Sequence, residues 1–267
     1  MRIGWLVRVL IVVVLALTIA VIFLPVRHRH EPGIRDEELA FLTVVMPGPL
    51  LSVSHLEVAD RSAVQVGQAE DQRWLALGVR PGQAKVNRGI RAELSIDAPF
   101  IPGEILTYAW RFRLAAPFPA DSANRWWLIA QWHDQPDPRL GETWADFPGR
   151  SPPVLIGIGE IDGVIHAGLR VGPTTAGQDQ QAAGDVVIDR DRWYSASLSV
   201  RWSQGADGWV RLVIDDEEVA SVTGPNLNNA YQHYWKLGMY RHPDIDGEAW
   251  IHLADVAITR PQATDHP

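Results

Sequence analysis

The chain of 267 residues contains no cysteine. This absence excludes a disulfide framework and a thiolate metal site, so packing alone must stabilise the fold. Runs of basic residues are also missing, and the formal net charge is -8. Both features argue against a nucleic-acid partner, which would need a clustered positive surface. Neither feature excludes binding to another polyanion through a locally basic groove.

Long apolar runs are missing everywhere except near the N-terminus. Every residue from Val9 to Leu24 is apolar except Thr18, and arginines lie on both sides of the run. This pattern predicts a signal peptide or a membrane anchor, and the lack of a nearby small-x-small cleavage site favours an uncleaved anchor. We therefore expect residues 1–26 to form one membrane helix and residues 27–50 a stalk. The remaining chain is expected to be exported and to face the periplasm or the extracellular side.

Short segments of alternating character dominate the chain from Leu51 onward, and Gly, Pro, Asn and Asp clusters separate them. In one such segment Tyr108, Trp110 and Phe112 face one way and Arg111 and Arg113 the other, so that one face is buried and the other is wet. This rhythm is typical of a sandwich of two antiparallel sheets, and it favours an all-β jelly roll over residues 51–262, with a disordered tail at 263–267. The expected strands are Trp74–Val79, Arg91–Ile96, Leu106–Leu114, Trp127–His133, Val154–Gly159, Val164–Val171, Trp193–Trp202, Trp209–Ile214, Glu218–Thr223, Trp235–Arg241 and Ala249–Thr259.

The sequence is rich in tryptophan, with twelve in total. Most of them are expected in the core, because large aromatic side chains dominate core burial. Trp144, in the polar stretch after His133, is the expected exception. Its ring would be available to stack on a sugar.

A lysine and a tyrosine lie four residues apart in the run YWKLGMY, residues 234–240. On a β-strand Lys236, Gly238 and Tyr240 share one face. A tyrosine has an ordinary pKa of about 10, and a neighbouring ammonium group favours the phenolate form. The run therefore predicts acid/base chemistry at Tyr240, assisted by Lys236.

A second run, RWWLIAQWH at residues 125–133, ends in a polar pair. Strict alternation puts Trp127, Gln131 and His133 on one face, and it puts Trp126 and Trp132 on the opposite, core face. The sequence thus predicts a strand that offers Gln131 and His133 to a site, with Trp132 kept away from the chemistry.

A third run, RAEL at residues 91–94, puts Arg91 and Glu93 on one face of a strand. Seen alone, this pair is equally consistent with a cross-strand ion pair on a solvated face. A single histidine such as His133 is more often a satisfied edge residue than a catalyst. The joint occurrence of the three runs favours a functional site.

Taken together, RAEL, QWH and YWKLGMY resemble, in order, the R-x-E-L, Q-[I/V]-H and Y-F-K-x-G-x-Y segments of jelly-roll polysaccharide lyases. The resemblance covers about residues 51–260 and is closer to glucuronan lyases than to alginate lyases. It implies a concanavalin A-like sandwich of the heparin lyase I-like superfamily. Two departures are visible, because Trp132 replaces the usual Ile or Val and Arg241 follows the tyrosine.

The resemblance implies cleavage of a 1,4-linked uronic-acid polysaccharide by β-elimination. Arg91 and Gln131 would neutralise the C6 carboxylate and stabilise the enolate-like intermediate. Tyr240 would protonate the departing oxygen, and either Tyr240 or His133 would remove the C5 proton. Substrate would be bound by a further set of side chains, namely Lys236, Arg241, Glu93, Arg111 and Trp144.

The expected partners are an anionic polysaccharide and, through the N-terminal helix, a membrane. No protein partner is implied, and no cofactor is required for catalysis. A structural calcium ion is compatible with a jelly roll, with Asp255 as the candidate ligand.

Two other classes of function fit parts of the sequence. Glu160-Ile161-Asp162 is similar to the E-x-D motif of jelly-roll glucanases, but Val164 and Ile165 stand where a second catalytic acid is needed, and Asp162-Gly163 reads as a turn. The other class is a membrane-tethered domain that binds anionic carbohydrate without cleaving it. Such a domain would not need Gln131, His133 and Tyr240 together.

Overall fold

The structure is a computed structural model, and it describes residues 52–69, 72–119, 121–174 and 180–260. The predicted membrane segment, the stalk and the tail lie outside these ranges. Within them, no helix is both long and apolar enough to cross a membrane.

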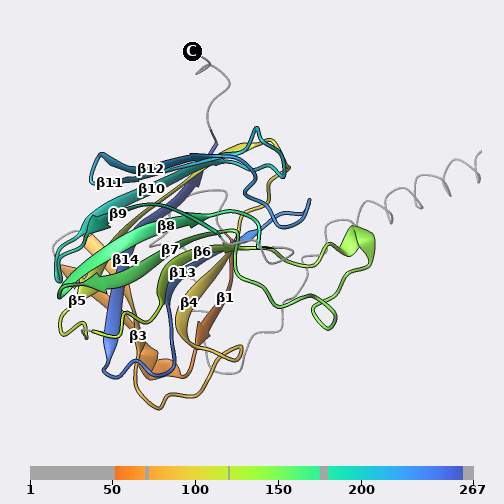
Figure 1. Ribbon diagram of the computed structural model, residues 1–267. Coiled ribbons are helices and arrows are strands. Elements are labelled where there is room, and N and C mark those ends of the chain that lie inside the picture. The colour runs from red at the N-terminus through yellow and green to blue at the C-terminus, as the bar shows by residue number, and fades with distance from the viewer. Residues whose placement is uncertain (1–51, 70–71, 120, 175–179, 261–267) are drawn as a thin grey trace, which may run out of the picture. The chain divides into compact units, whose positions relative to one another are not determined.

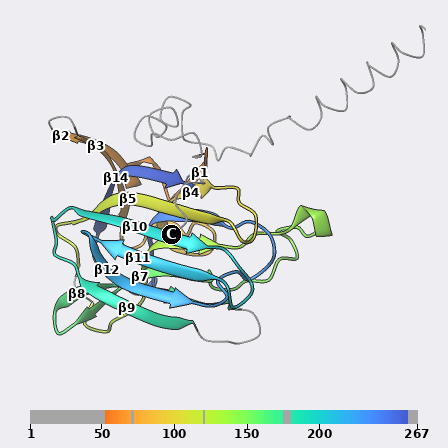
Figure 2. The ribbon, with the colours of Figure 1, turned by 90° about the horizontal axis from the view of Figure 1, so that it is seen from above.

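The described residues form two seven-stranded sheets that lie one over the other (Figure 1; Figure 2). Neighbouring strands are antiparallel throughout, which confirms the predicted all-β sandwich. Sheet A contains, in spatial order, β1 (Ser52–Val58), β4 (Ile90–Asp97), β13 (Tyr234–Arg241), β6 (Trp127–His133), β7 (Val154–Ile161), β8 (Val164–Val171) and β9 (Gln181–Val187). Sheet B contains β12 (Glu217–Thr223), β11 (Trp209–Ile214), β10 (Tyr194–Arg201), β5 (Ile105–Ala115), β14 (Ala249–Thr259), β3 (Gln72–Val79) and β2 (Val64–Ala69).

Aromatic side chains fill the space between the sheets. The rings of Trp132 on β6 and Trp235 on β13 are stacked with centroids 5.8 Å apart. Tyr108 on β5 of the opposite sheet meets both of them edge-on, at 5.3 and 5.2 Å. These contacts fix the inner face of the two strands that carry Gln131 and Lys236 on their outer face. The prediction that Trp132 belongs to the core is confirmed, since its side chain is fully buried.

All eleven expected strands are present, with ends that differ from the prediction by at most two residues. Three strands were missed, namely β1, β2 and β9. Each of them lies at an edge of its sheet, where a strand pairs on one side only. The residues of β2 and β9 are largely exposed, so their sequences carry little apolar alternation.

A local irregularity in β6 reverses part of the predicted pattern. The pairing of β6 with β7 shifts between Leu128 and Ala130, as it does where a β-bulge interrupts a strand. Beyond the shift Trp127 points into the core and is 3% exposed, whereas Trp126 is 41% exposed. The prediction that placed Trp126 on the core face and Trp127 on the face of Gln131 is therefore wrong. Strict alternation fails here because the shift changes the phase of the strand.

Short 3-10 helices interrupt two of the connections, at η1 (Arg61–Ala63) and η2 (Pro138–Leu140). The connection between β6 and β7 carries η2 and extends away from the sandwich in both views (Figure 1; Figure 2). Trp144 lies in this connection and is 61% exposed, as predicted.

Candidate functional site

The outer face of sheet A gathers polar side chains from four adjacent strands. Strand pairing places Tyr240 beside Arg91, Gly238 beside Glu93, and Lys236 beside Gln131. On the other side of β4, Glu57 of β1 pairs with Glu93. Because directly paired residues of neighbouring strands point to the same face, all of these side chains lie on one surface. The three predicted runs therefore do come together.

An ion-pair network connects the cations of this surface. Lys236 Nζ lies 2.7 Å from Oε1 of Glu57 and 2.8 Å from its Oε2. Arg91 Nη1 lies 3.2 Å from Glu57 and 3.2 Å from Glu93. Burial alone would raise the pKa of Glu57, but the hydrogen bond with His55 and the charges of Lys236 and Arg91 hold that pKa far below its usual range. Glu57 is therefore a permanent anion at neutral pH.

Glu93 occupies the centre of the network and is 1% exposed. Burial raises the pKa of Glu93, although the charges of Lys236 and Arg91 oppose the rise. The Nε2 atom of Gln131 donates a hydrogen bond to Glu93 at 2.5 Å. Two cations and one permanent anion therefore surround the carboxyl group of Glu93.

Tyr240 lies above this network and is only half-buried. The guanidinium carbon of Arg91 is 3.9 Å from the centre of its ring. Gly89 provides the room, since a Cβ atom at that position would come within 2.4 Å of the ring. Lys236 was predicted as the cation beside Tyr240, but the structure gives this place to Arg91 and pairs Lys236 with Glu57. The difference arises because sequence spacing could not reveal the carboxylate on β1.

His133 lies at the far end of the same face. Its Nδ1 atom is 2.8 Å from the carbonyl oxygen of Asp134, and its Nε2 atom is 3.1 Å from that of Arg150. A neutral imidazole can donate from only one nitrogen, so at least one of these contacts requires rearrangement or protonation. The ring also stacks on Tyr234, with centroids 5.7 Å apart. His133 is therefore better placed to orient its surroundings than to accept a proton from a ligand.

A buried carboxylate supports this end of the face. Burial opposes the charge of Asp134, but hydrogen bonds from His133 and Arg150 hold its pKa well below the usual range. Asp134 also accepts a hydrogen bond from the side chain of Asn228 at 3.1 Å. Trp144 meets the ring of Tyr234 edge-on at 6.2 Å, so this exposed tryptophan borders the polar face.

Two of the predicted substrate-binding residues lie elsewhere. Arg241 is 1% exposed, and its guanidinium donates to the carbonyl oxygen of Gly247 at 2.8 Å and lies over Trp127. Alternation along β13 turns it away from the face of Tyr240, so the prediction for Arg241 is wrong. Arg111 lies on β5 of sheet B, where it pairs with Asp255 at 3.5 Å. The prediction for Arg111 is wrong as well, because the other sheet carries the polar face.

Asp255, the predicted calcium ligand, is therefore the partner of an arginine. In the part of the chain that the structure describes, no group of three or more His, Asp or Glu side chains is placed to hold a metal ion.

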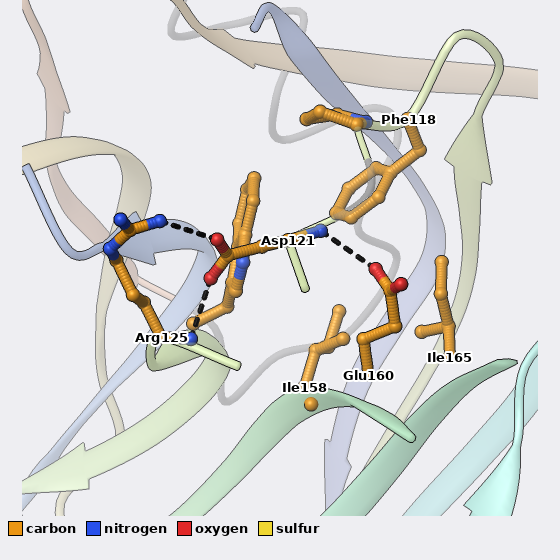
Figure 3. Close-up of a pocket in the computed structure, with 9 residues that line it drawn as sticks. Phe118, Asp121, Arg125, Ile158, Glu160 and Ile165 are labelled. Carbon is orange, nitrogen blue, oxygen red and sulfur yellow. Dashed lines mark hydrogen bonds and ion pairs between the residues drawn. The ribbon is translucent and has the colours of Figure 1, made fainter. Parts of the chain in front are cut away.

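The carboxylate of the alternative hydrolase motif lies in a small pocket (Figure 3). There Glu160 Oε2 accepts a hydrogen bond from the backbone nitrogen of Asp121 at 2.7 Å, and Asp121 pairs with Arg125 at 2.5 Å. Asp162 has a positive φ of 52° between β7 and β8, which confirms the predicted turn. Glu160 thus has a structural role near the end of β7. The E-x-D motif therefore does not support a hydrolase.

Glu57 is the residue of this site that the sequence analysis missed. It lies in the edge strand β1, whose sequence SVSHLEV has only a weak apolar pattern. The sequence does contain one indication of this role. His55 and Glu57 are two residues apart and so share one face of a strand, and in the structure their side chains are 3.1 Å apart.

Comparisons with known proteins agree with this architecture. The polysaccharide lyase family model matches residues 33–257. No curated protein sequence matches the chain. An endo-β-1,4-glucuronan lyase from the fungus Trichoderma reesei has a similar structure, with a TM-score of 0.59 and 14% identity over 79% of this chain and 92% of the other.

Two alginate lyase structures are also similar. The family-7 alginate lyase A1-II' has a TM-score of 0.53 at 13% identity, covering 83% of this chain and 87% of the other. A variant of alginate lyase Aly36B in complex with an alginate tetrasaccharide has a TM-score of 0.52 at 11% identity, covering 78% and 86%. At these identities the likeness shows a shared fold.

Proposed function

Because the chain belongs to the polysaccharide lyase family, we propose that it cleaves a 1,4-linked uronic-acid polysaccharide of the glucuronan or alginate type. The reaction is a β-elimination. The C5 proton is removed, the electron pair of the broken C5–H bond forms a C4–C5 double bond, and the C4–O4 bond breaks. The leaving O4 oxygen takes a proton, and an unsaturated uronate remains at the new end.

The polar residues on the outer face of sheet A suit the charge changes of this reaction. The substrate carboxylate must be neutralised before its neighbouring carbon can release a proton. Arg91 and Gln131 provide N–H groups for this purpose, since Gln131 uses one of its two amide hydrogens for Glu93 and retains the other. Tyr240 is the proton-transfer group, as acid and also as base, because His133 is engaged with two carbonyl oxygens.

The observation that carries the proposal is the contact chain from Tyr240 to Gln131. The ring of Tyr240 covers the Arg91 guanidinium, Arg91 pairs with Glu93, and Glu93 accepts a hydrogen bond from Gln131. Three strands that are far apart in the sequence contribute to it. A sugar-binding module without chemistry has no need for a phenol, a guanidinium and an amide in this arrangement.

The test is a panel of polymers incubated with the full-length chain, with glucuronan, alginate, hyaluronan and heparan sulfate as substrates. The product's new double bond absorbs in the ultraviolet, so elimination is followed directly. We expect absorbance to rise on glucuronan or alginate and to stay flat with Tyr240→Phe. Tight binding of one polymer with no absorbance change, in a folded protein, would instead assign a binding module.

We also propose that the catalytic domain acts outside the cytoplasm on a membrane tether formed by residues 1–26. The apolar run from Val9 to Leu24 supports this proposal. Fractionation of cells that express the chain, followed by protease treatment of intact spheroplasts, tests it. A protected domain in the soluble fraction would contradict it.

A further inference from the structure

Arg170 lies on the same outer face of sheet A, two strands away from Gln131. Strand pairing runs from Gln131 on β6 to Leu155 on β7 and from Leu155 to Arg170 on β8. Neighbouring strands are about 4.8 Å apart, so the backbones at Gln131 and Arg170 are separated by about 10 Å. That span matches about two sugar units of an extended 1,4-linked chain laid across the strands. Arg170 is thus level with the candidate site but beyond it.

Arg170 differs from the cations of the candidate site in its partners among the described residues. Arg170 is exposed, and among the described residues it has no hydrogen-bond or ion-pair partner. Arg91 and Lys236 are buried and paired with carboxylates. The acidic side chain of neighbouring β9, Asp185, is engaged by Nδ1 of His166 at 2.5 Å. Arg170 is therefore available to a carboxylate from outside.

The surface between Gln131 and Arg170 is low and apolar. Leu155 separates the two polar side chains and is itself 6% exposed. In the next row, β7 and β8 present Gly157 opposite Gly168, so that only backbone forms the surface there. An added Cβ at Gly157 would meet the Trp127 carbonyl oxygen at 3.2 Å, which shows how closely the strands approach. The sugar units between the candidate site and Arg170 can lie on such a floor.

We infer that Arg170 forms a second carboxylate-binding subsite, which holds a uronate unit about two sugars away from the one that reacts. The inference rests on the proposed function, because it assumes a polymer with a carboxylate on successive units. A planar guanidinium binds a carboxylate through two parallel hydrogen bonds, so the subsite selects uronic acids over neutral sugars. It also directs the chain across the strands, from β13 toward β8.

The test compares Arg170→Ala, Arg170→Lys and Arg211→Ala with the unaltered full-length chain. Arg211 lies on sheet B and pairs with Glu218, so its loss changes the net charge equally without touching sheet A. With the polymer that the chain cleaves, we expect Arg170→Ala to raise KM roughly tenfold, the loss of one charge-assisted contact, while kcat is retained. Arg170→Lys should recover part of the loss. Arg211→Ala should leave KM unchanged.

Substrate length and salt separate a subsite from a general charge effect. A uronate disaccharide, which is too short to span both sites, should show a smaller effect of Arg170→Ala than the long polymer. The KM of Arg170→Ala should also depend less steeply on salt. An unchanged KM on the polymer, or an equal rise with Arg211→Ala, overturns the inference even if the chain is an active lyase.

Failure of the proposed function has a different signature. If the unaltered chain eliminates none of the polymers, calorimetric binding of glucuronan and alginate replaces KM as the readout. Weaker binding by Arg170→Ala than by Arg211→Ala then supports the subsite, and equal binding, or no binding by any variant, overturns it.

Discussion

Lys236 on β13 reaches across β4 to place its Nζ atom 2.7 Å from Oε1 of Glu57 on β1. Both side chains are only 5% exposed. A buried charge without a partner is far more costly than a buried pair, so each of these residues depends on the other. Arg91 shares the same carboxylate. The edge strand β1 thereby fixes two cations of a site formed by β4, β13 and β6.

This pair predicts non-additive effects on stability. We expect Glu57→Gln to lower the free energy of unfolding by about 3 kcal/mol, because it leaves the ammonium group of Lys236 buried without its nearer counter-charge. Lys236→Met should cost a similar amount, since it leaves Glu57 with one cation fewer. The double variant should cost clearly less than the sum of the two. Urea unfolding followed by circular dichroism measures all three values. Full additivity would show that the two side chains do not interact.

The same residues show what the sequence could predict. The buried faces of both sheets can be predicted from the sequence, because segments such as residues 106–114 alternate regularly and bury one face. Arg91, Gln131, Lys236 and Tyr240 were found because their strands are central ones, where the pattern is strong. Glu57 was missed because an edge strand pairs on one side only and its apolar pattern is weak.

Long-range pairing accounts for the remaining differences. Which cation lies beside Tyr240 depends on the register of β4 against β13 and on a carboxylate that is 179 residues from Lys236 in the chain. The exchange of Trp126 and Trp127 depends on one pairing shift in β6. Neither event leaves a local mark in the sequence, since a bulge needs no special residue.

The two tyrosines of β13 should differ in function. Burial and the nearby carboxylates of Glu57, Glu93 and Asp134 raise the pKa of Tyr234, so this phenol holds its proton firmly. Tyr240 lies instead against the Arg91 guanidinium. We expect Tyr240→Phe to reduce kcat by about 10²-fold or more, the usual contribution of a proton-transfer group.

Tyr234→Phe is the matched control, because it removes one hydroxyl from the same face of the same strand. It should retain most of the turnover measured by ultraviolet absorbance of the unsaturated product. Circular dichroism and polymer binding should be unchanged in both variants. If Tyr234→Phe were the inactive one, the proton-transfer role would belong to the end of the face that holds His133.

Stability should fall as the pH drops below neutrality, because of His233. This ring is 1% exposed, and burial lowers its pKa from 6.5 to about 4. Between these values the unfolded chain binds a proton that the folded chain does not, so unfolding becomes easier as the pH falls. The full contribution of His233 to the free energy of unfolding is present above about pH 6.5, and about 3 kcal/mol of it is lost by pH 4.

Urea unfolding at several pH values tests this window. The slope of the unfolding free energy against pH should become shallower in His233→Phe, whatever its stability at neutral pH. His252→Phe should reduce the slope less, because that ring is partly exposed although its pKa is also lowered to about 4. Identical slopes in all three proteins would mean that neither histidine is held neutral by the fold.

Trp126, directly before β6, and Trp127, its first residue, should behave in opposite ways, because the pairing shift separates their environments. Trp127 packs on Phe118 in the core with ring centroids 4.9 Å apart, so Trp127→Ala should cost about 3 to 5 kcal/mol of unfolding free energy. Trp126 is 41% exposed and meets the ring of Tyr240 edge-on at 4.7 Å. Trp126→Ala should cost about 1 kcal/mol or less, yet it should raise KM, because an exposed ring beside Tyr240 is placed to stack on a bound sugar.

Unfolding curves and KM values measured for the two variants test this difference. A large loss of stability in Trp126→Ala, with Trp127→Ala nearly unaffected, would restore strict alternation along β6 and remove the bulge.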